Sequence, residues 1–478
     1  MTRNKIVLSI LFFLMFLTFF PINAKVENPM DVNIDFWYVE PDNTDDTLIS
    51  QVNAFATSSG ISITVKGLSL TNAISEFKAA SLNGTAPVMI QGLATWIPEL
   101  VTNGLLKVIE KNNFLEEFMA ESLRSVSYYE IVNDVINANN ILYYGFPQRV
   151  DTQAFLYSKT RAELKGAVIP AIDETWGIPA FKTAITKMND QSDPANKLYG
   201  FSFTDLPAGA EPLFYGNNGL KFYNFTVDQD NIAIESNNSI QALQTMYEIV
   251  QVNRLTPDYT EQGSALTYKH FAIDGDVAST FGYASEMKKY LSSSQYSDSS
   301  KLGMAPVPKE NAGSGGSLEV MALMISSLAS VDEQTTALNL AKHLTSESVL
   351  VDNAKNEYLL PPVWDAYDHA DIITNQIIQN FKYLLKDARE LPISKYWSSI
   401  QSGFAIEVGE MLNGDQNGTI AARAIRIRWS FLLPATMEVA PIPPVGEIKT
   451  EPKTSPFIGP EILIFALGLG IILLRRRR

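Results

Sequence analysis

The chain has 478 residues, no cysteine, and 52 acidic against 37 basic side chains, which give a net charge of −15. An acidic body lacks the basic footprint that nucleic acid and anionic lipid require, so we expect no nucleic-acid partner. The absence of cysteine excludes disulfides, a thiolate nucleophile and a lipid-bearing cysteine near the N-terminus.

The N-terminus has the pattern of a secretory signal peptide. Arg3 and Lys5 precede an apolar run, Ile6–Phe20, which is followed by a cleavage site after Ala24. We therefore predict that residues 1–24 are removed and that the body lies outside the cytoplasm. Without the two ends, roughly 430 residues remain, which is long enough for two lobes.

The body opens with strands and helices in alternation. Alternating apolar and polar residues predict strands at 32–37 and 61–65, and an apolar run predicts a third strand at 87–90. Helix-length stretches lie between and after them, which is typical of a mostly parallel α/β sheet with right-handed crossovers. Later helices are predicted at 180–188, 239–252, 333–344, 373–385 and 397–412.

The C-terminal end combines a spacer with an apolar segment. Frequent prolines predict a stiff linker at 434–456, and the apolar residues 457–474 before the arginines 475–478 predict a membrane anchor with a basic cytoplasmic tail. However, only Ile462–Leu474 is free of charge, and a bilayer needs about twenty residues, so a sorting signal that is replaced by another anchor stays open. Anchoring without a lipid-bearing cysteine favours an archaeal-type envelope.

Four Asn-x-Ser/Thr sequons fit a glycosylated exterior protein. Such triplets also arise by chance in surface loops, so both interpretations stay open. The acceptors are Asn83, Asn224, Asn237 and Asn417.

Several short motifs follow one another in a recognisable order. They are Phe36-Trp37, Gly84-Thr-Ala-Pro87, Asn103-Gly-Leu-Leu106, Tyr144-Gly-Phe-Pro147, the segment 151–159, Glu174-Thr-Trp176, the segments 271–283 and 302–308, Leu360-Pro361, and Pro392 leading to Trp397. In this order the chain resembles the extracellular solute-binding proteins of ABC importers, in the sugar-binding branch that is maltose-binding-protein-like. The likeness covers nearly the whole body, with a departure at Val88, where that family usually has Asp.

The resemblance implies an α/β, two-lobed periplasmic-binding-protein-like fold of type II, with a hinge between the lobes. Lobe 1 would comprise residues 25–150 and 318–372, and lobe 2 residues 151–317 and 373–433. Such a monomeric receptor, without a cofactor, closes around a sugar or oligosaccharide and delivers it to an ABC permease in the membrane, and it is not an enzyme.

The resemblance also indicates which residues face the ligand. Aromatic rings pack on sugar C–H groups, whereas amides, carboxylates and Arg bind hydroxyls. The matching positions are Trp37, Tyr38, Glu40, Gln91, Thr95, Trp96, Arg149 and Asp151, faced by Tyr215, Tyr283 and Trp397 from the second lobe. Tyr283 is the strongest candidate because it follows Gly282 in a loop. Trp96 and Trp397 lie in helical sequence, where a core position is as good an interpretation.

No metal site is predicted. Asp274-Gly-Asp276 lacks the Glu that closes a calcium loop, so it is interpreted as a turn, and His270, His343 and His369 have no zinc-type spacing.

Other classes of protein are less well supported. A secreted, membrane-anchored glycoside hydrolase is the enzyme alternative, although no pair of catalytic carboxylates stands out. A surface-layer or adhesion protein would show repeated β-sandwich signals, which are missing. Among receptors, peptide or polyamine ligands stay open. A neutral sugar is favoured over an anion because aromatic residues outnumber basic ones at the candidate positions.

Overall fold

A computed structural model describes residues 33–39, 46–114, 117–128, 141–217, 233–310, 315–391 and 394–432. The predicted signal peptide, proline linker and C-terminal apolar segment lie outside these ranges. Within them, none of the helices combines the length and the apolar character that a bilayer crossing requires.

The first of two main sheets has six strands in the order β11–β10–β3–β1–β2, with β6 also paired to β10. Its strands are β1 (Asn33–Val39), β2 (Ser62–Leu68), β3 (Met89–Leu93), β6 (Phe146–Asp151), β10 (Ser317–Ile325) and β11 (Arg389–Glu390). β1 runs parallel to β2 and β3, which confirms the predicted α/β opening, whereas β10 runs antiparallel to β3 and β6. β3 passes its predicted end because residues up to Leu93 pair with the distant β10.

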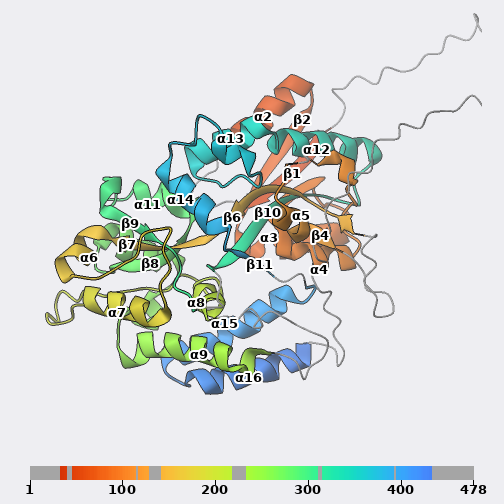
Figure 1. The fold of residues 1–478 in the computed structure, drawn as a ribbon. Helices are drawn as coiled ribbons and strands as arrows, with labels where there is room; N and C mark the ends of the chain where they lie inside the picture. The colour runs from red at the N-terminus through yellow and green to blue at the C-terminus, as the bar shows by residue number, and fades with distance from the viewer. Residues whose placement is uncertain are drawn as a thin grey trace, which may run out of the picture. The chain divides into compact units, whose positions relative to one another are not determined.

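Helices cover both faces of this sheet (Figure 1). Successive residues of β3 point to opposite faces, so Met89 packs with the core under α2 and α12, and Ile90 packs with Phe77 of α3. The helices of this part are α2 (Asp46–Ser59), α3 (Leu70–Leu82), α4 (Ile97–Thr102), α5 (Ala120–Ser125), α12 (Val331–Leu344) and α13 (Glu347–Glu357), and a small ribbon pairs β4 (Ser127–Tyr128) with β5 (Leu142–Tyr143).

The second main sheet is antiparallel, in the order β8–β7–β9. Its strands are β7 (Gln153–Ser158), β8 (Ser279–Tyr283) and β9 (Leu302–Ala305). Aromatic rings fill the core beneath it: Phe281 lies 5.1 Å from Phe201 and 5.7 Å from Phe181, between ring centroids. The surrounding helices are α6 (Lys159–Lys165), α7 (Ile178–Met188), α8 (Glu211–Gly216), α9 (Asn237–Tyr247), α10 (Ser264–Tyr268), α11 (Met287–Leu291), α15 (Trp397–Asn413) and α16 (Gly418–Leu432).

All five later helices that the sequence predicts are present, as α7, α9, α12, α14 (Gln376–Leu385) and α15. α14 begins at Gln376, three residues after its predicted start, because the Asn375 side chain caps it. Asn375 Oδ1 accepts hydrogen bonds from the backbone N–H groups of Ile377 (3.1 Å) and Ile378 (3.3 Å).

One very short connection joins the two main sheets. β6 of the first sheet ends at Asp151, and β7 of the second begins at Gln153, so only the buried Thr152 separates them. The chain returns to the first sheet when β10 begins at Ser317. The predicted crossing near Asp151 fits this arrangement, while the exact lobe boundaries stay a prediction.

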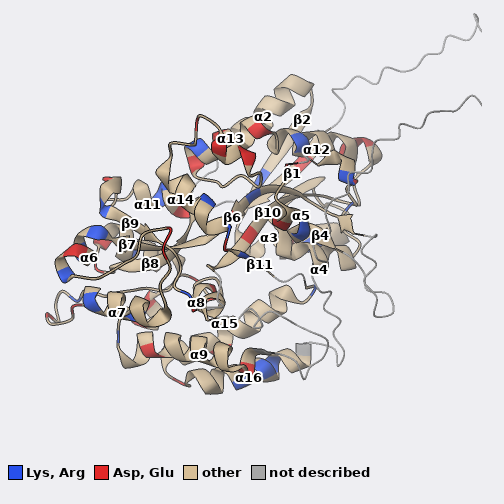
Figure 2. Cartoon of the chain, viewed as in Figure 1, with Lys and Arg blue, Asp and Glu red and all other residues tan. Residues whose placement is uncertain are grey.

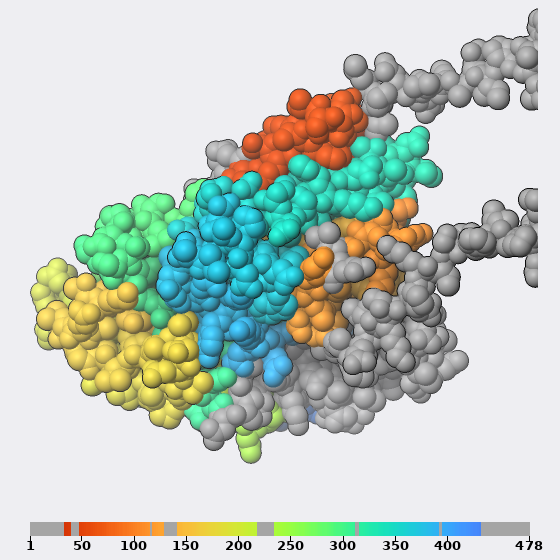
Figure 3. All heavy atoms as spheres, turned by 45° about the horizontal axis from the view of Figure 1, so that its top comes forward, coloured from red at the N-terminus to blue at the C-terminus, as the bar shows by residue number. Residues whose placement is uncertain are grey.

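α14 also lies between the parts of the chain that carry the two sheets. Its Tyr383 hydroxyl donates to Asp173 O (3.2 Å), and Figure 3 shows the light-blue segment around α14 against the yellow segment before α7. Charged side chains of both signs are interspersed along the described helices (Figure 2), in keeping with the absence of a basic footprint in the sequence.

Candidate functional site

Buried polar side chains gather where the two sheets meet. Among the residues that are less than a tenth exposed are Gln91, Gln148, Asp151, Gln153, Glu211 and Ser317, which come from β3, β6, β7, α8 and β10. Polar groups are buried at a cost unless they are hydrogen-bonded, so such a concentration calls for a structural or a binding role.

A hydrogen-bond network links the sheets through Tyr283. Its hydroxyl accepts a hydrogen bond from Gln153 Nε2 (2.8 Å) and donates one to Glu319 Oε1 (3.1 Å). Ser317 Oγ donates to Gln153 Oε1 (3.3 Å). Because Tyr283 ends β8 in the second sheet and Glu319 lies on β10 in the first, the contact spans the junction.

The Glu319 carboxyl is strongly perturbed. Burial raises its pKa to about 8, and the nearby carboxylates of Glu211 and Asp151 act in the same direction. Hydrogen bonding to Tyr283 and the charge of Arg149 oppose this shift only in part. A carboxyl with this pKa keeps its proton at neutral pH, so it can donate as well as accept a hydrogen bond.

Tyr215 belongs to the same cluster. It is 2 % exposed, and burial, followed by the charges of Glu211, Glu319 and Glu390, raises the pKa of its hydroxyl well above the usual value. The junction therefore brings together two of the predicted ligand residues, Tyr215 and Tyr283, with two carboxyls that the sequence did not indicate.

Asp151 holds the protein's own backbone. Its Oδ1 accepts hydrogen bonds from the N–H groups of Thr152 (2.9 Å) and Ala284 (2.9 Å), and its Oδ2 accepts one from Ser285 N–H (3.3 Å). Asp151 thus fastens β6 to the turn after β8. Burial raises the pKa of its carboxyl, and these hydrogen bonds counteract the rise.

Gln91 also connects strands. The sequence had suggested a position after the third strand. Gln91 lies within β3 instead, because this strand extends to Leu93. Its Oε1 accepts a hydrogen bond from Val39 N–H (3.2 Å), and its Nε2 donates to Gln148 Oε1. Its amide therefore ties β1, β3 and β6 together.

Thr95 and Glu319 line a small cavity at the junction. Its volume of about 10 Å³ is close to the minimum for one water molecule. Thr95 Oγ1 is buried and has no hydrogen-bond partner among the residues that the structure describes. Leu93, Ala94, Ser125, Leu318, Val320 and Leu391 complete the lining. In this structure the cavity is too small to hold a sugar.

The other aromatic candidates are mostly core residues in this structure. Trp96 is 6 % exposed and packs over Gly92, where an added Cβ would lie 2.2 Å from its ring. Trp397 (2 % exposed) belongs to the core of the second sheet, and Tyr38 (3 %) packs with Phe36. All three are packed in the core in this structure, and their contact with a ligand stays a prediction.

Two further candidates come from the end of β1 and the residue after it in the sequence. The ring of Trp37 is half-buried, with the Lys66 ammonium 4.2 Å from its centroid. Glu40 lies outside the described residues.

Sequence reasoning missed Gln153, Glu211, Ser317 and Glu319. A usable signal existed for the two acids: Glu319 is a lone charge in the apolar strand 318–325, and Glu211 is a lone charge in the apolar stretch 206–216. A charge in such a setting is buried only with partners or for function.

Asp274 and Asp276 form a group with His270. His270 Nδ1 lies 2.9 Å from Asp276 Oδ2, and Asp274 is close by. The three side chains are close enough to hold a metal ion, but the Lys269 ammonium already pairs with Asp274, so we assign no metal here. Of the sequon acceptors, Asn83, Asn237 and Asn417 are exposed, and Asn224 lies outside the described residues.

Comparisons with known proteins agree with this architecture. The model of a family described as bacterial extracellular solute-binding protein matches residues 50–380. No curated protein sequence matches the chain. Among solved structures, the GacH receptor of Streptomyces glaucescens, studied with acarbose, has 18 % identity and a TM-score of 0.71, over 84 % of this chain and 98 % of its own.

Two more solved structures are similar. A solute-binding protein of an ABC transporter from Thermotoga lettingae, bound with α-D-tagatose, has 17 % identity and a TM-score of 0.70, over 84 % of this chain and 99 % of its own. Maltose-bound MalE3 of T. maritima has 18 % identity and a TM-score of 0.69, over 84 % and 100 %. At these identities the likeness shows the two-lobed α/β fold.

Proposed function

Since the chain belongs to the bacterial extracellular solute-binding protein family, we propose that it is an extracytoplasmic receptor that captures a sugar or oligosaccharide by lobe closure. It then delivers this solute to an ABC permease. The structurally similar proteins that are described with maltose, tagatose or acarbose support a saccharide as the solute.

The observation that carries the proposal is the polar junction itself. Tyr283, Gln153 and Glu319 hold the sheets together by hydrogen bonds, next to a Thr95 hydroxyl without a described partner. When the lobes separate, these groups lose their mutual contacts, and the hydroxyls of a sugar replace them. A ligand that satisfies both sides favours the closed state through this difference in contacts.

The candidate residues then divide by role. We propose that Tyr283, Glu319, Gln153, Thr95 and Arg149 bind the solute. Tyr215 and Glu211 lie next to them, and Asp151 and Gln91 position the strands. Contacts from Trp37, Tyr38, Glu40, Trp96 and Trp397 stay predictions from the resemblance.

The test is a thermal-shift screen across saccharides, peptides and polyamines, followed by titration calorimetry. A solute at 100 times its Kd stabilises the folded protein by about 2.7 kcal/mol. A saccharide that raises the melting temperature supports the proposal. If only peptides or polyamines do so, the sugar assignment is wrong, and the receptor role stands.

A glycoside hydrolase is the second candidate, and one observation favours it. Glycosidases need a carboxyl with a raised pKa beside a second carboxylate, and Glu319 lies near Glu211 and Asp151 in this way. Incubation of the bound oligosaccharide, with analysis of products by mass spectrometry, separates the two. Intact oligosaccharide supports a receptor, and cleavage supports a hydrolase.

We further propose that the receptor is a monomer, made with a signal peptide at 1–24. The C-terminal residues 457–474 hold it at the outer face of the membrane, and the linker 434–456 keeps it close to the permease. Mass spectrometry of the mature protein tests both ends. A C-terminus cut before residue 475 would favour replacement by another anchor.

A further inference from the structure

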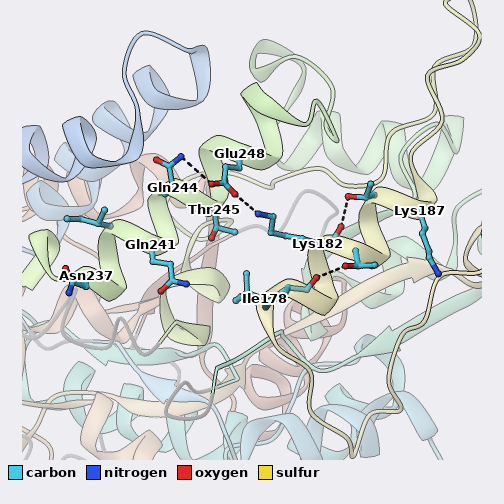
Figure 4. A pocket seen from close by; sticks show the side chains of 12 residues that line it. Ile178, Lys182, Lys187, Asn237, Gln241, Gln244, Thr245 and Glu248 are labelled. Carbon is cyan, nitrogen blue, oxygen red and sulfur yellow. Dashed lines mark hydrogen bonds and ion pairs between the residues drawn. The ribbon is translucent and has the colours of Figure 1, made fainter.

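A groove of about 690 Å³ lies between α7 and α9, on residues that take no part in the lobe junction (Figure 4). Its volume is within the range of sites for small organic ligands, about 300–1,000 Å³. It therefore has room for a short oligosaccharide.

One face of α9 supplies a row of hydrogen-bonding side chains to this groove. Asn237, Gln241 and Gln244 of α9 and its C-cap residue Glu248 follow one another at intervals of three or four residues, so they lie on the same side. At 1.5 Å of rise per residue, the row is about 16 Å long. Amide and carboxylate groups arranged in this way suit a ligand that is rich in hydroxyls.

The facing helix, α7, contributes a cation and an apolar surface. The Lys182 ammonium pairs with the Glu248 carboxylate across the groove. Ile178 of α7 and Ile240 of α9 also line it, which provides contact for the apolar faces of sugar rings. Both kinds of contact that a saccharide needs are thus present.

The other end of the row is Asn237, the acceptor of the sequon Asn237-Asn-Ser. Asn237 is exposed and is the first residue of α9, directly after the N-cap Ser236. The described sequon acceptors Asn83 and Asn417 are exposed too, but neither lines the groove. We propose that Asn237 carries an N-linked glycan whose first sugar units lie in the groove between α7 and α9.

Attachment makes this occupant favourable even if each contact is weak. A covalently linked sugar meets the groove as an intramolecular ligand, so its effective concentration is high. The glycan would contact both α7 and α9 and so restrict local opening of α7. This inference relies on export of the chain but not on the identity of the transported solute.

The first experiment is peptide mapping by mass spectrometry on protein purified from its own organism. It is followed by hydrogen exchange of the same sample before and after enzymatic removal of glycans. We expect a glycan on Asn237 and slower amide exchange, by several-fold, in α7 while it is present. Unmodified Asn237 would overturn the proposal, and so would equal exchange in α7 with and without the glycan.

Variants made in the same organism separate the groove from glycosylation in general. Asn237→Gln should speed exchange in α7 to the rate of the deglycosylated protein. Asn83→Gln, which changes the sequon at the C-cap of α3, should leave exchange in α7 unchanged. Gln241→Ala alters an exposed side chain of the row. It should speed exchange in α7 only when the glycan is present, and an equal effect without the glycan would contradict the model.

Discussion

Replacing Glu319 by Gln should change how the stability of the protein depends on pH. Glutamine has nearly the same shape and can still accept the hydrogen bond of Tyr283, but it cannot ionise. In the wild type, burial raises the pKa of Glu319 from 4.5 to about 8. The folded protein therefore retains a proton that the unfolded chain releases at lower pH.

The expected size follows from this shift. The contribution of the Glu319 carboxyl to folding stability is complete below pH 4.5 and is lost as the pH rises to about 8. Between these values only the unfolded chain ionises at this residue, and ionisation stabilises the unfolded state. At about 1.36 kcal/mol for each pH unit, the full loss is about 5 kcal/mol, and about 3 kcal/mol of it has occurred by pH 7. Glu319→Gln should lack this loss, so its stability relative to the wild type should rise with pH.

The assay is urea unfolding followed by tryptophan fluorescence, at several pH values from about 4.5 to 8.5. Glu163→Gln, at an exposed position of α6, is the control, and it should track the wild type. Parallel curves for Glu319→Gln and the wild type would refute the assignment of a partly buried, protonated carboxyl at the junction.

Further predictions concern the same junction. Tyr283→Phe removes the hydroxyl between Gln153 and Glu319, so it should destabilise the protein by about 1–3 kcal/mol and weaken saccharide binding, as measured by urea unfolding and calorimetry. Thr95→Val keeps the side-chain shape and removes a hydroxyl without a described partner. Urea unfolding should show equal or higher stability, and calorimetry should show a lower saccharide affinity. Unchanged affinity would exclude Thr95 from the site. Asp151→Ala leaves three backbone N–H groups without their acceptor, so urea unfolding should show a loss of stability of roughly 2–4 kcal/mol. A loss below about 0.5 kcal/mol would contradict the role of Asp151 in holding β6 to the turn after β8.

The sequence predicted the order of elements better than the contacts between distant strands. Local alternation was enough to find β1 and β2, because burial of one face imposes a period of two. The end of β3 was misplaced because its last residues pair with β10, more than two hundred residues later. Gln91 consequently lies in the sheet and not in a loop.

The site was only partly predictable, for a related reason. Tyr283 could be placed by the resemblance, and it lies at the junction. Gln153 escaped notice because its role depends on two sheets coming together, which no local pattern records. Glu319 offered only the signal of a lone charge in an apolar strand, which does not show what it contacts. For Trp96 and Trp397, helical context indicated the core as readily as a ligand contact, and both are buried in this structure.

The single-residue connection between β6 and β7 suits the protein to use as an optical sensor of movement between the two sheets. A rotation of one sheet against the other has few backbone torsions to act on near Thr152, so it would appear as a change in distance between points on the two halves. Leu82 on α3 and Leu164 on α6 are 87 % and 79 % exposed. In a chain without cysteine, Leu82→Cys and Leu164→Cys would provide its only two thiols, ready for a donor and an acceptor dye.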